Sequence, residues 1–427
     1  MKYKFLSISI PIILLVIASF YITAQFIQPS PKKEFTSATG SKDGQYYKTA
    51  LLYKKILEDE KVKVNIVTSS GSMQNLQLLQ DKKVDIAFVQ NGIELNEKQK
   101  HLKAIGSIYY EPIWVFYKNK KYTIDYIVEL TSKKISVGVE GSGTNHLALQ
   151  ILKDNGISKE NSTLYSYDSS KSKKLLMNDK IDAMFVVGSA NSKVIKELLE
   201  DSSINVFSFK RSKAYSRKYN YLESLSLYEG TIDLYRNIPY EDSNLLATTA
   251  NLVINDSLSD ELQRLLLRKL FTIHNKKGLF EKNDQFPNIS NLTIPVSEEA
   301  QRYYTYGDTW LEKIFPYWIA SNLDRLKILL IPLLTLLFPL FKGVLPLYRW
   351  SIRSKIYKWY DKIQGIDKII DELNLVELKQ NLEELEKLRK EIKNETKVPL
   401  SYMGEYYDLI MHLELLISQL NIKIASK

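Results

Sequence analysis

The stretch GVEGSGTNHLALQIL, residues 138–152, places a run of small residues between an apolar strand and a helical pattern. Backbone amides at a helix start, together with the helix dipole, favour a bound anion by roughly 0.3–1 kcal/mol in a wet site. The run is not a P-loop, because no Gly-Lys-Ser/Thr follows, and it lacks the third glycine of the dinucleotide fingerprint. Two alternatives remain: a carboxylate held by the amides of residues 142–144, or a tight turn that binds nothing. The residues of the run are Gly141, Ser142, Gly143 and Thr144.

A second glycine-bearing turn, TGSKDGQYY, lies near residue 40. Gly40 and Gly44 let the backbone turn toward a ligand and leave amides free at the start of a helix. Tyr46 and Tyr47 can each supply an aromatic wall or a hydroxyl, and the pattern does not decide between them. The alternative is a bare turn without a ligand.

Polar side chains also stand where two strands end. In TSSGSMQNL, Ser72 and Asn75 lie at a strand-to-helix junction. Ser70 or Ser72 can cap the helix, Ser72 can contact a ligand, and one residue can do both. Gln90 closes the apolar strand VDIAFVQ. Its amide either hydrogen-bonds the occupant of a cleft or is an ordinary polar strand end.

The residue types that catalysis or metal binding requires are not arranged for it. The chain has no cysteine, and its four histidines are scattered without metal-ligand spacing. No Ser-His-Asp order with a nucleophile elbow is present. The net charge of +10 forms no compact Arg-rich patch with interleaved aromatics, which argues against nucleic acid as a partner. We therefore expect a binding protein that is not an enzyme and has no cofactor or metal.

Between residues 30 and 322, apolar runs alternate with helical patterns, which is typical of a mostly parallel α/β sheet covered on both faces. A Gly-rich turn opens a helix near residue 40 and again near 141, and each is followed by a strand that carries an acid, KVDIAFVQ and KIDAMFVVG. This order predicts two similar lobes, with SIYYEPIWVFY (107–117) crossing between them and a ligand cleft at the carboxyl ends of the strands. The predicted strands are 63–69, 84–90, 113–118 and 134–140, and the predicted helices are 47–60 and 144–156.

Two long apolar runs flank this part of the chain. Residues 5–27 and 326–348 are each long enough to cross a bilayer of roughly 30 Å. For 5–27 an uncleaved anchor is favoured over a cleaved signal peptide, because Ala24 has Ile22 rather than a small residue two positions before it. The basic segment that follows residue 348 predicts a cytoplasmic C-terminus, and Lys2 and Lys4 predict the same for the N-terminus. The domain between the spans would then be extracytoplasmic.

The tail, 349–427, combines a basic segment next to the membrane with a helical pattern. The Trp- and Tyr-rich residues 348–362 suit contact with anionic lipid headgroups. Leucine stripes on both sides of Pro399 predict a helical hairpin over 363–427. Both a self-packed pair of helices and a coiled-coil dimer fit this pattern.

Several blocks together carry a resemblance to a known family. SATGSKDGQYYKTA is similar to the opening of the TAXI solute-binding receptors, a strand followed by Thr-Gly-Gly-x-x-Gly-x-Tyr-Tyr. TSSGSMQNLQLLQDKKVDIAFVQNG, YYEPIWVFY, GVEGSGTNHLALQIL and KIDAMFVVG resemble the next four blocks in order. IPVSEEAQRYY, LEKIFPYWIASNLDRL and YRWSIRSKIYKWY resemble the membrane-tethered branch with a C-terminal transmembrane span. The match covers roughly residues 35–365, with departures at Ser41 and at Asn91-Gly92.

The resemblance implies an extracytoplasmic receptor with a two-lobed, type II periplasmic-binding-protein-like fold that serves a TRAP-type membrane permease. It also implies that Tyr46 or Tyr47 walls the interlobe cleft and that Ser72 and Asn75 face it. The 141–144 block would bind the carboxylate of an amino acid or organic acid. A rival interpretation is a membrane-anchored sensor or interaction protein whose lobes signal to the tail, because a transport receptor does not need a long cytoplasmic tail.

Overall fold

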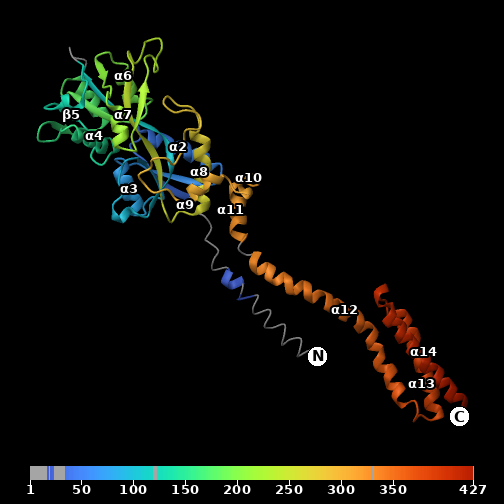
Figure 1. The fold of residues 1–427 in the computed structure, drawn as a ribbon. Coiled ribbons are helices and arrows are strands. Elements are labelled where there is room, and N and C mark those ends of the chain that lie inside the picture. The colour runs from blue at the N-terminus through green and yellow to red at the C-terminus, as the bar shows by residue number, and fades with distance from the viewer. Residues whose placement is uncertain (1–16, 19, 24–33, 119–122, 328–329, 427) are drawn as a thin grey trace. The chain divides into compact units, whose positions relative to one another are not determined.

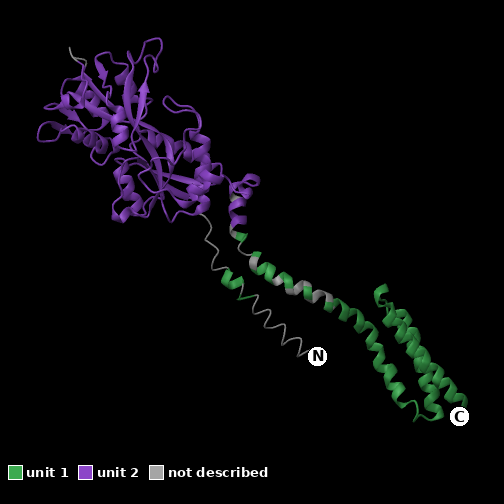
Figure 2. Ribbon diagram, in the orientation of Figure 1, with its two compact units in different colours: residues 1–28, 326–427 green, residues 29–325 purple. Residues whose placement is uncertain are grey.

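The computed structural model describes residues 17–18, 20–23, 34–118, 123–327 and 330–426. The chain divides into two compact units, residues 29–325 and residues 1–28 with 326–427 (Figure 2). The sequence predicts the binding domain over 30–322, and the boundary between the two units falls after Arg325. Most of the apolar run 5–27 lies outside the described residues.

Residues 29–325 form two lobes (Figure 1). The lobes share one ten-stranded sheet of order β2-β1-β3-β10-β4-β7-β5-β6, with β8 beside β4 and β9 beside β10. In each lobe the first strand lies between the second and the third, and all three are parallel. This repeated β-α-β-α-β order confirms the prediction of two similar lobes. The first lobe is built from β1 (Glu34–Ala38), α2 (Gln45–Glu58), β2 (Lys63–Val67), α3 (Ser72–Gln80) and β3 (Ile86–Gln90). The second is built from β5 (Lys134–Ser136), α4 (Gly143–Asp154), β6 (Thr163–Tyr165), α5 (Ser169–Met177) and β7 (Ala183–Val187).

Two long strands, β4 (Leu102–Lys118) and β10 (Ser243–Asn255), connect the lobes. They pair antiparallel with each other, β10 also pairs with β3 of the first lobe, and β4 also pairs with β7 of the second. The expectation of a mostly parallel sheet is therefore wrong, because the crossing strands run against the strands of both lobes. The segment 107–117 does cross as predicted, but it is the middle of one 17-residue strand.

The sheet is buried on both faces, as the apolar strands require. Two apolar clusters cover the two faces in the first lobe and two more do so in the second. The remaining elements of the second lobe are η2 (Ile127–Leu130), α6 (Lys193–Leu199), β8 (Ile204–Val206), α7 (Ser212–Lys218) and β9 (Glu223–Leu227). Those of the first lobe are η1 (Glu97–Gln99), α8 (Asp260–His274), α9 (Glu298–Tyr306), α10 (Trp310–Ile314) and α11 (Tyr317–Leu326).

The C-terminal helices form a separate apolar core. The end of α12 (Leu330–Ile369) packs with α13 (Leu375–Glu395) and α14 (Met403–Ser426), which are joined through η4 (Leu400–Tyr402). Within this core, the indole of Trp359 donates a hydrogen bond to Thr396 Oγ1 at 2.8 Å. The predicted hairpin is thus self-packed and gains α12 as a third helix. The predicted span 326–348 lies mainly in the first half of α12, and within the described part of the chain no helix meets the length and apolarity that a membrane crossing requires.

Candidate functional site

A cleft of about 400 Å³ lies between the two lobes. It is formed by the segments that follow β1, β2, β3, β5, β6 and β7, so it occupies the carboxyl ends of the parallel strands in both lobes. This is where open α/β sheets place their ligands. Most of the residues that the sequence singles out line it: Gly40, Gly44, Tyr46, Ser72, Gln90, Ser142, Gly143 and Thr144.

Three residues singled out from the sequence are not among the lining residues. Asn75 is fully buried, donates to the Phe88 carbonyl at 2.7 Å and accepts from Ser69 Oγ at 2.6 Å, so it holds the first lobe together. Tyr47 is half-buried, and its neighbour Tyr46 takes the place in the cleft wall. Gly141 instead accepts a hydrogen bond from the Met73 amide at 3.2 Å through its carbonyl.

Several polar groups proposed from the sequence are already engaged by the protein. The N-cap of α3 is Gly71, so the cap alternative for Ser72 is wrong; Ser72 Oγ accepts from the Gln90 amide at 2.9 Å. The Gly44 amide donates to the Ser41 carbonyl at 2.9 Å and is therefore not free, contrary to the expectation from the sequence.

The turn before α4 retains two amides for an anion. Ser142 is the N-cap: its Oγ accepts from the Asn145 amide at 3.2 Å, and its own amide donates to the Val139 carbonyl at 3.0 Å. The Gly143 and Thr144 amides begin the helix and have no acceptor within the described residues, as is usual for a first turn. The carboxylate expectation therefore rests on these two amides, and Ser142 serves to cap the helix.

The two lobes meet across the cleft at the turn before α4. Gln90 Nε2, in the first lobe, donates to the Gly143 carbonyl of the second at 3.1 Å. A Cβ on Gly143 would lie 2.2 Å from Gln90 Oε1, and one on Gly71 would lie 3.1 Å from Ser142 Cα. Glycine at both positions is therefore what lets the lobes approach this closely, and the structure is that of a closed cleft.

Glu111 is a cleft residue that the sequence analysis missed. It lies on β4 with 6% of its surface exposed, and it accepts a hydrogen bond from Tyr46 Oη at 2.8 Å. The Tyr46 ring also stacks on Phe88, with ring centroids 5.6 Å apart. Burial raises the pKa of the Glu111 carboxyl from 4.5 to about 7, and the hydrogen bond from Tyr46 opposes this increase. The signal in the sequence was a single acid inside an otherwise apolar strand, YYEPIWVFY.

The charge of the cleft lining is mainly acidic. Its charged side chains are those of Asp43, Glu111, Asp168 and Lys193, so acids outnumber bases. Asp168 also caps α5 by accepting from the Lys171 amide at 2.8 Å. Within the described residues, no group of three or more His, Asp or Glu side chains is placed to hold a metal ion.

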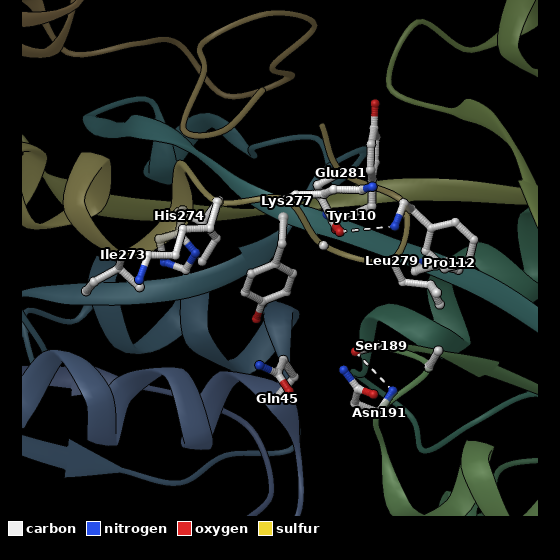
Figure 3. Close-up of a pocket in the computed structure, with 16 residues that line it drawn as sticks. Gln45, Tyr110, Pro112, Ser189, Asn191, Ile273, His274, Lys277, Leu279 and Glu281 are labelled. Carbon is white, nitrogen blue, oxygen red and sulfur yellow. Dashed lines mark hydrogen bonds between the residues drawn. The ribbon is translucent and has the colours of Figure 1, made fainter. Parts of the chain in front are cut away.

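A second cavity, of about 270 Å³, adjoins the cleft and shares Gln45 and Ser189 with it. Figure 3 shows Gln45 and Ser189 on one side of it and Tyr110 and Glu281 on the other. The Tyr110 amide donates to Glu281 Oε1 at 3.1 Å, which ties β4 to the loop after α8. His274 also lines the cavity, and burial lowers its pKa to about 4, so its ring is neutral at neutral pH.

Comparison with known proteins gives a family and several structural likenesses. The model of the NMT1-like family matches residues 37–305. An ancestral arginine-binding protein bound to arginine is 13% identical, with a TM-score of 0.39 over 57% of this chain and 94% of that one. A protein from Bordetella bronchiseptica RB50 is 18% identical, with a TM-score of 0.41 over 57% and 72%. The periplasmic aliphatic sulphonate binding protein SsuA from Escherichia coli is 13% identical, with a TM-score of 0.37 over 58% and 72%. No curated protein sequence matches the chain.

Proposed function

This chain belongs to the NMT1-like family, and from that premise we propose that it is a solute-binding receptor whose lobes close on a small carboxylate-bearing solute. The observation that carries the proposal is the interlobe cleft at the carboxyl ends of the strands, with two helix-start amides, those of Gly143 and Thr144, in its lining. Such amides bind an anion without a cationic side chain. Because the Gln90–Gly143 and Met73–Gly141 hydrogen bonds join the lobes, a bound solute would add contacts that favour the closed form.

Binding by the full-length chain in detergent micelles tests this function. We would record thermal unfolding with amino acids, dicarboxylates, keto acids and sugars, since a solute at a hundred times its dissociation constant adds about 2.7 kcal/mol of stability. We expect stabilisation by a carboxylate, and its loss in Thr144→Pro, which removes one of the two amides. Thr144→Val is the matched control, because it keeps the amide and removes the hydroxyl that accepts from the Val187 amide. A well-folded chain that no solute stabilises would refute the proposal.

The membrane arrangement is part of the same proposal. Residues 5–27 and 326–348 would anchor the chain at both ends, with the lobes on the extracytoplasmic face of the cell membrane and both termini in the cytoplasm. The chain has no cysteine, so single cysteines report sidedness without a background signal. A membrane-impermeant maleimide should label Lys55→Cys in intact cells, and Glu383→Cys only after permeabilisation. Labelling of both positions in intact cells would contradict this topology.

We further propose that a TRAP-type permease receives the solute, as the resemblance to TAXI receptors implies. Cells that lack this chain should then lose uptake of the solute that it binds. Uptake that continues unchanged in such cells would exclude the transport role and leave the binding function intact.

One observation favours a second role, that of a sensor. The end of α12, α13 and α14 share an apolar core of their own, and such a folded unit is more than an anchor requires. If the lobes signal to these helices, solute should change amide hydrogen exchange in α13 and α14. Transport alone predicts unchanged exchange there, and uptake that survives removal of residues 375–427.

A further inference from the structure

We propose that the solute is a zwitterion whose ammonium group binds the Glu111 carboxylate and whose carboxylate binds the amides of Gly143 and Thr144. This inference rests on the proposed function, since it names the solute class for the same cleft. An amino acid is the simplest molecule that fits this description.

Glu111 has an environment that a structural carboxylate rarely has. It is buried on a central strand, and its hydrogen-bond partner is the neutral phenol of Tyr46. Tyr109 is the other titratable side chain that interacts with it, and it too is neutral at neutral pH because burial raises its pKa. Within the described residues, no lysine or arginine contributes to the pKa of Glu111. Burying a carboxylate without a counter-charge costs several kcal/mol, so the fold itself gains nothing from this acid.

A ligand ammonium would supply the missing counter-charge. Glu111 lines the cleft, and its pKa near 7 leaves about half of it ionised at neutral pH without ligand. An opposite charge within about 4–6 Å favours the ionised form. The cation would therefore lower the pKa of Glu111 and stabilise the complex.

The opposite wall of the cleft has the opposite polarity. The amides of Gly143 and Thr144 stand at the start of α4, where the helix dipole is positive. Glu111 belongs to the side of the cleft that carries Tyr46, whereas α4 belongs to the second lobe. A molecule with one charge of each sign thus matches both walls and bridges the lobes in the closed form.

The remaining charges argue against the other candidate solutes. Because acids outnumber bases in the lining, a dicarboxylate would face Asp43, Glu111 and Asp168 with only Lys193 as a cationic partner. A monocarboxylate without an amino group would leave Glu111 unpaired, and an amine without a carboxylate would leave the α4 amides unpaired. A polar site rejects a solute that lacks one of the expected groups, because the buried protein group then loses its partner.

Calorimetric titration of the full-length chain with a matched series of ligands tests the inference. A screen of L-amino acids identifies the best binder, which is then compared with its des-amino acid and with its methyl ester. We expect the des-amino acid and the ester each to bind at least thirtyfold more weakly. This comparison uses the unchanged protein, so it does not depend on whether a variant folds.

Variants then assign the ammonium site. Glu111→Gln keeps the shape of the side chain and removes its charge, so affinity for the amino acid should fall at least tenfold while that for the des-amino acid is unchanged or rises. Glu160→Gln is the matched control, since it makes the same change at an exposed acid outside the cleft lining and should leave the preference unchanged. If Glu111→Gln does not fold, Tyr46→Phe, which removes the hydroxyl bonded to Glu111, should weaken binding of the amino acid only.

Two negative results have different meanings. If the des-amino acid binds as tightly as the amino acid, the zwitterion inference is overturned and the chain remains a carboxylate receptor. If no solute of any class binds to the folded chain, the proposed function itself fails, and this inference fails with it.

Discussion

Gly143→Ala should open the cleft without unfolding the lobes. Gly143 is the first residue of α4 and has no left-handed backbone conformation, so alanine is compatible with its backbone. The added methyl group would lie 2.2 Å from Gln90 Oε1 and 3.1 Å from Gln90 Cβ in the closed form. The amide end of Gln90 can turn within the cleft that it lines, but its Cβ is fixed by the central strand β3 and cannot move away alone.

The size of the effect follows from two contributions. Forcing one extra carbon into a packed contact costs about 1–3 kcal/mol, and losing the Gln90–Gly143 hydrogen bond costs about 0.5–1.5 kcal/mol. Opening of the cleft relieves the steric clash and so limits the sum of these two costs. We therefore expect the closed form to be disfavoured by about 1–3 kcal/mol. Because solute binds the closed form, its apparent affinity should fall by about tenfold, which corresponds to about 1.4 kcal/mol.

Distances between spin labels measure this directly. Lys55 on α2 and Lys153 on α4 are exposed and lie in different lobes, and the chain has no cysteine to interfere with labelling of Lys55→Cys and Lys153→Cys. Gly143→Ala should lengthen the mean distance and broaden its distribution. Gly40→Ala is the matched control, because its Cβ would meet Tyr46 at an ordinary 3.9 Å.

A second substitution separates crowding from other effects of alanine. Gln90→Ala removes Oε1 and Cδ, the two atoms nearest to the new methyl group, and keeps Cβ at 3.1 Å, so adding it to Gly143→Ala should shorten the distance again. An unchanged distance distribution in Gly143→Ala would refute the reasoning, because the lobes would then not be held by this contact.

Further predictions concern stability and are read from urea unfolding of the full-length chain. Glu111 has a pKa of about 7 in the folded chain against 4.5 in the unfolded chain, so its contribution to the free energy of unfolding is most favourable below pH 4.5 and is lost as the pH rises through 7. The loss is at most about 3 kcal/mol, and Glu111→Gln should abolish it. His274 has a pKa of about 4 in the folded chain against 6.5 in the unfolded chain, so its contribution to stability is present above pH 6.5 and is lost as the pH falls through 4. His274→Phe should abolish this loss at low pH. If the stability of either variant followed the same pH profile as that of the unchanged chain, the corresponding assignment would be wrong. Arg264→Met should lower stability by about 3–5 kcal/mol, because Arg264 is buried among three carboxylates that join α8 to α9, α10 and α11. Arg353→Met, which breaks an exposed pair with Glu405, should change it by less than about 1 kcal/mol, and equal effects would show that burial does not matter here.

Features encoded over short stretches of sequence were predicted well. The helices α2 and α4, the strands β2, β3, β5 and β7, and the polar segments at the strand ends were found because periodicity and turn residues act over neighbouring positions. The predicted helix 144–156 is α4 (Gly143–Asp154), and the predicted strand 84–90 contains β3 (Ile86–Gln90). Parallel strands then bring those segments to one edge of the sheet whatever the details of packing.

Features that depend on distant pairing were not predicted. The segment that forms β10 was not predicted as a strand, although it pairs with β3, β4 and β9 and so makes the sheet mixed. The hydrogen bonds of Ser72 and Gln90 were not predicted for the same reason: Ser72 bonds to Gln90, 18 residues away, and Gln90 bonds to Gly143, 53 residues away.

The sequence by itself determined that the chain has two α/β lobes and that glycine-bearing and polar segments follow their strands. Only the tertiary structure decided that Glu111 is buried without a cation, that Tyr46 rather than Tyr47 reaches it, and that Gly143 must lack a side chain to admit Gln90. The physical reason is that periodicity specifies which face of an element is buried, whereas burial of a charge, its pKa and the clearance between two turns depend on all the segments packed around them.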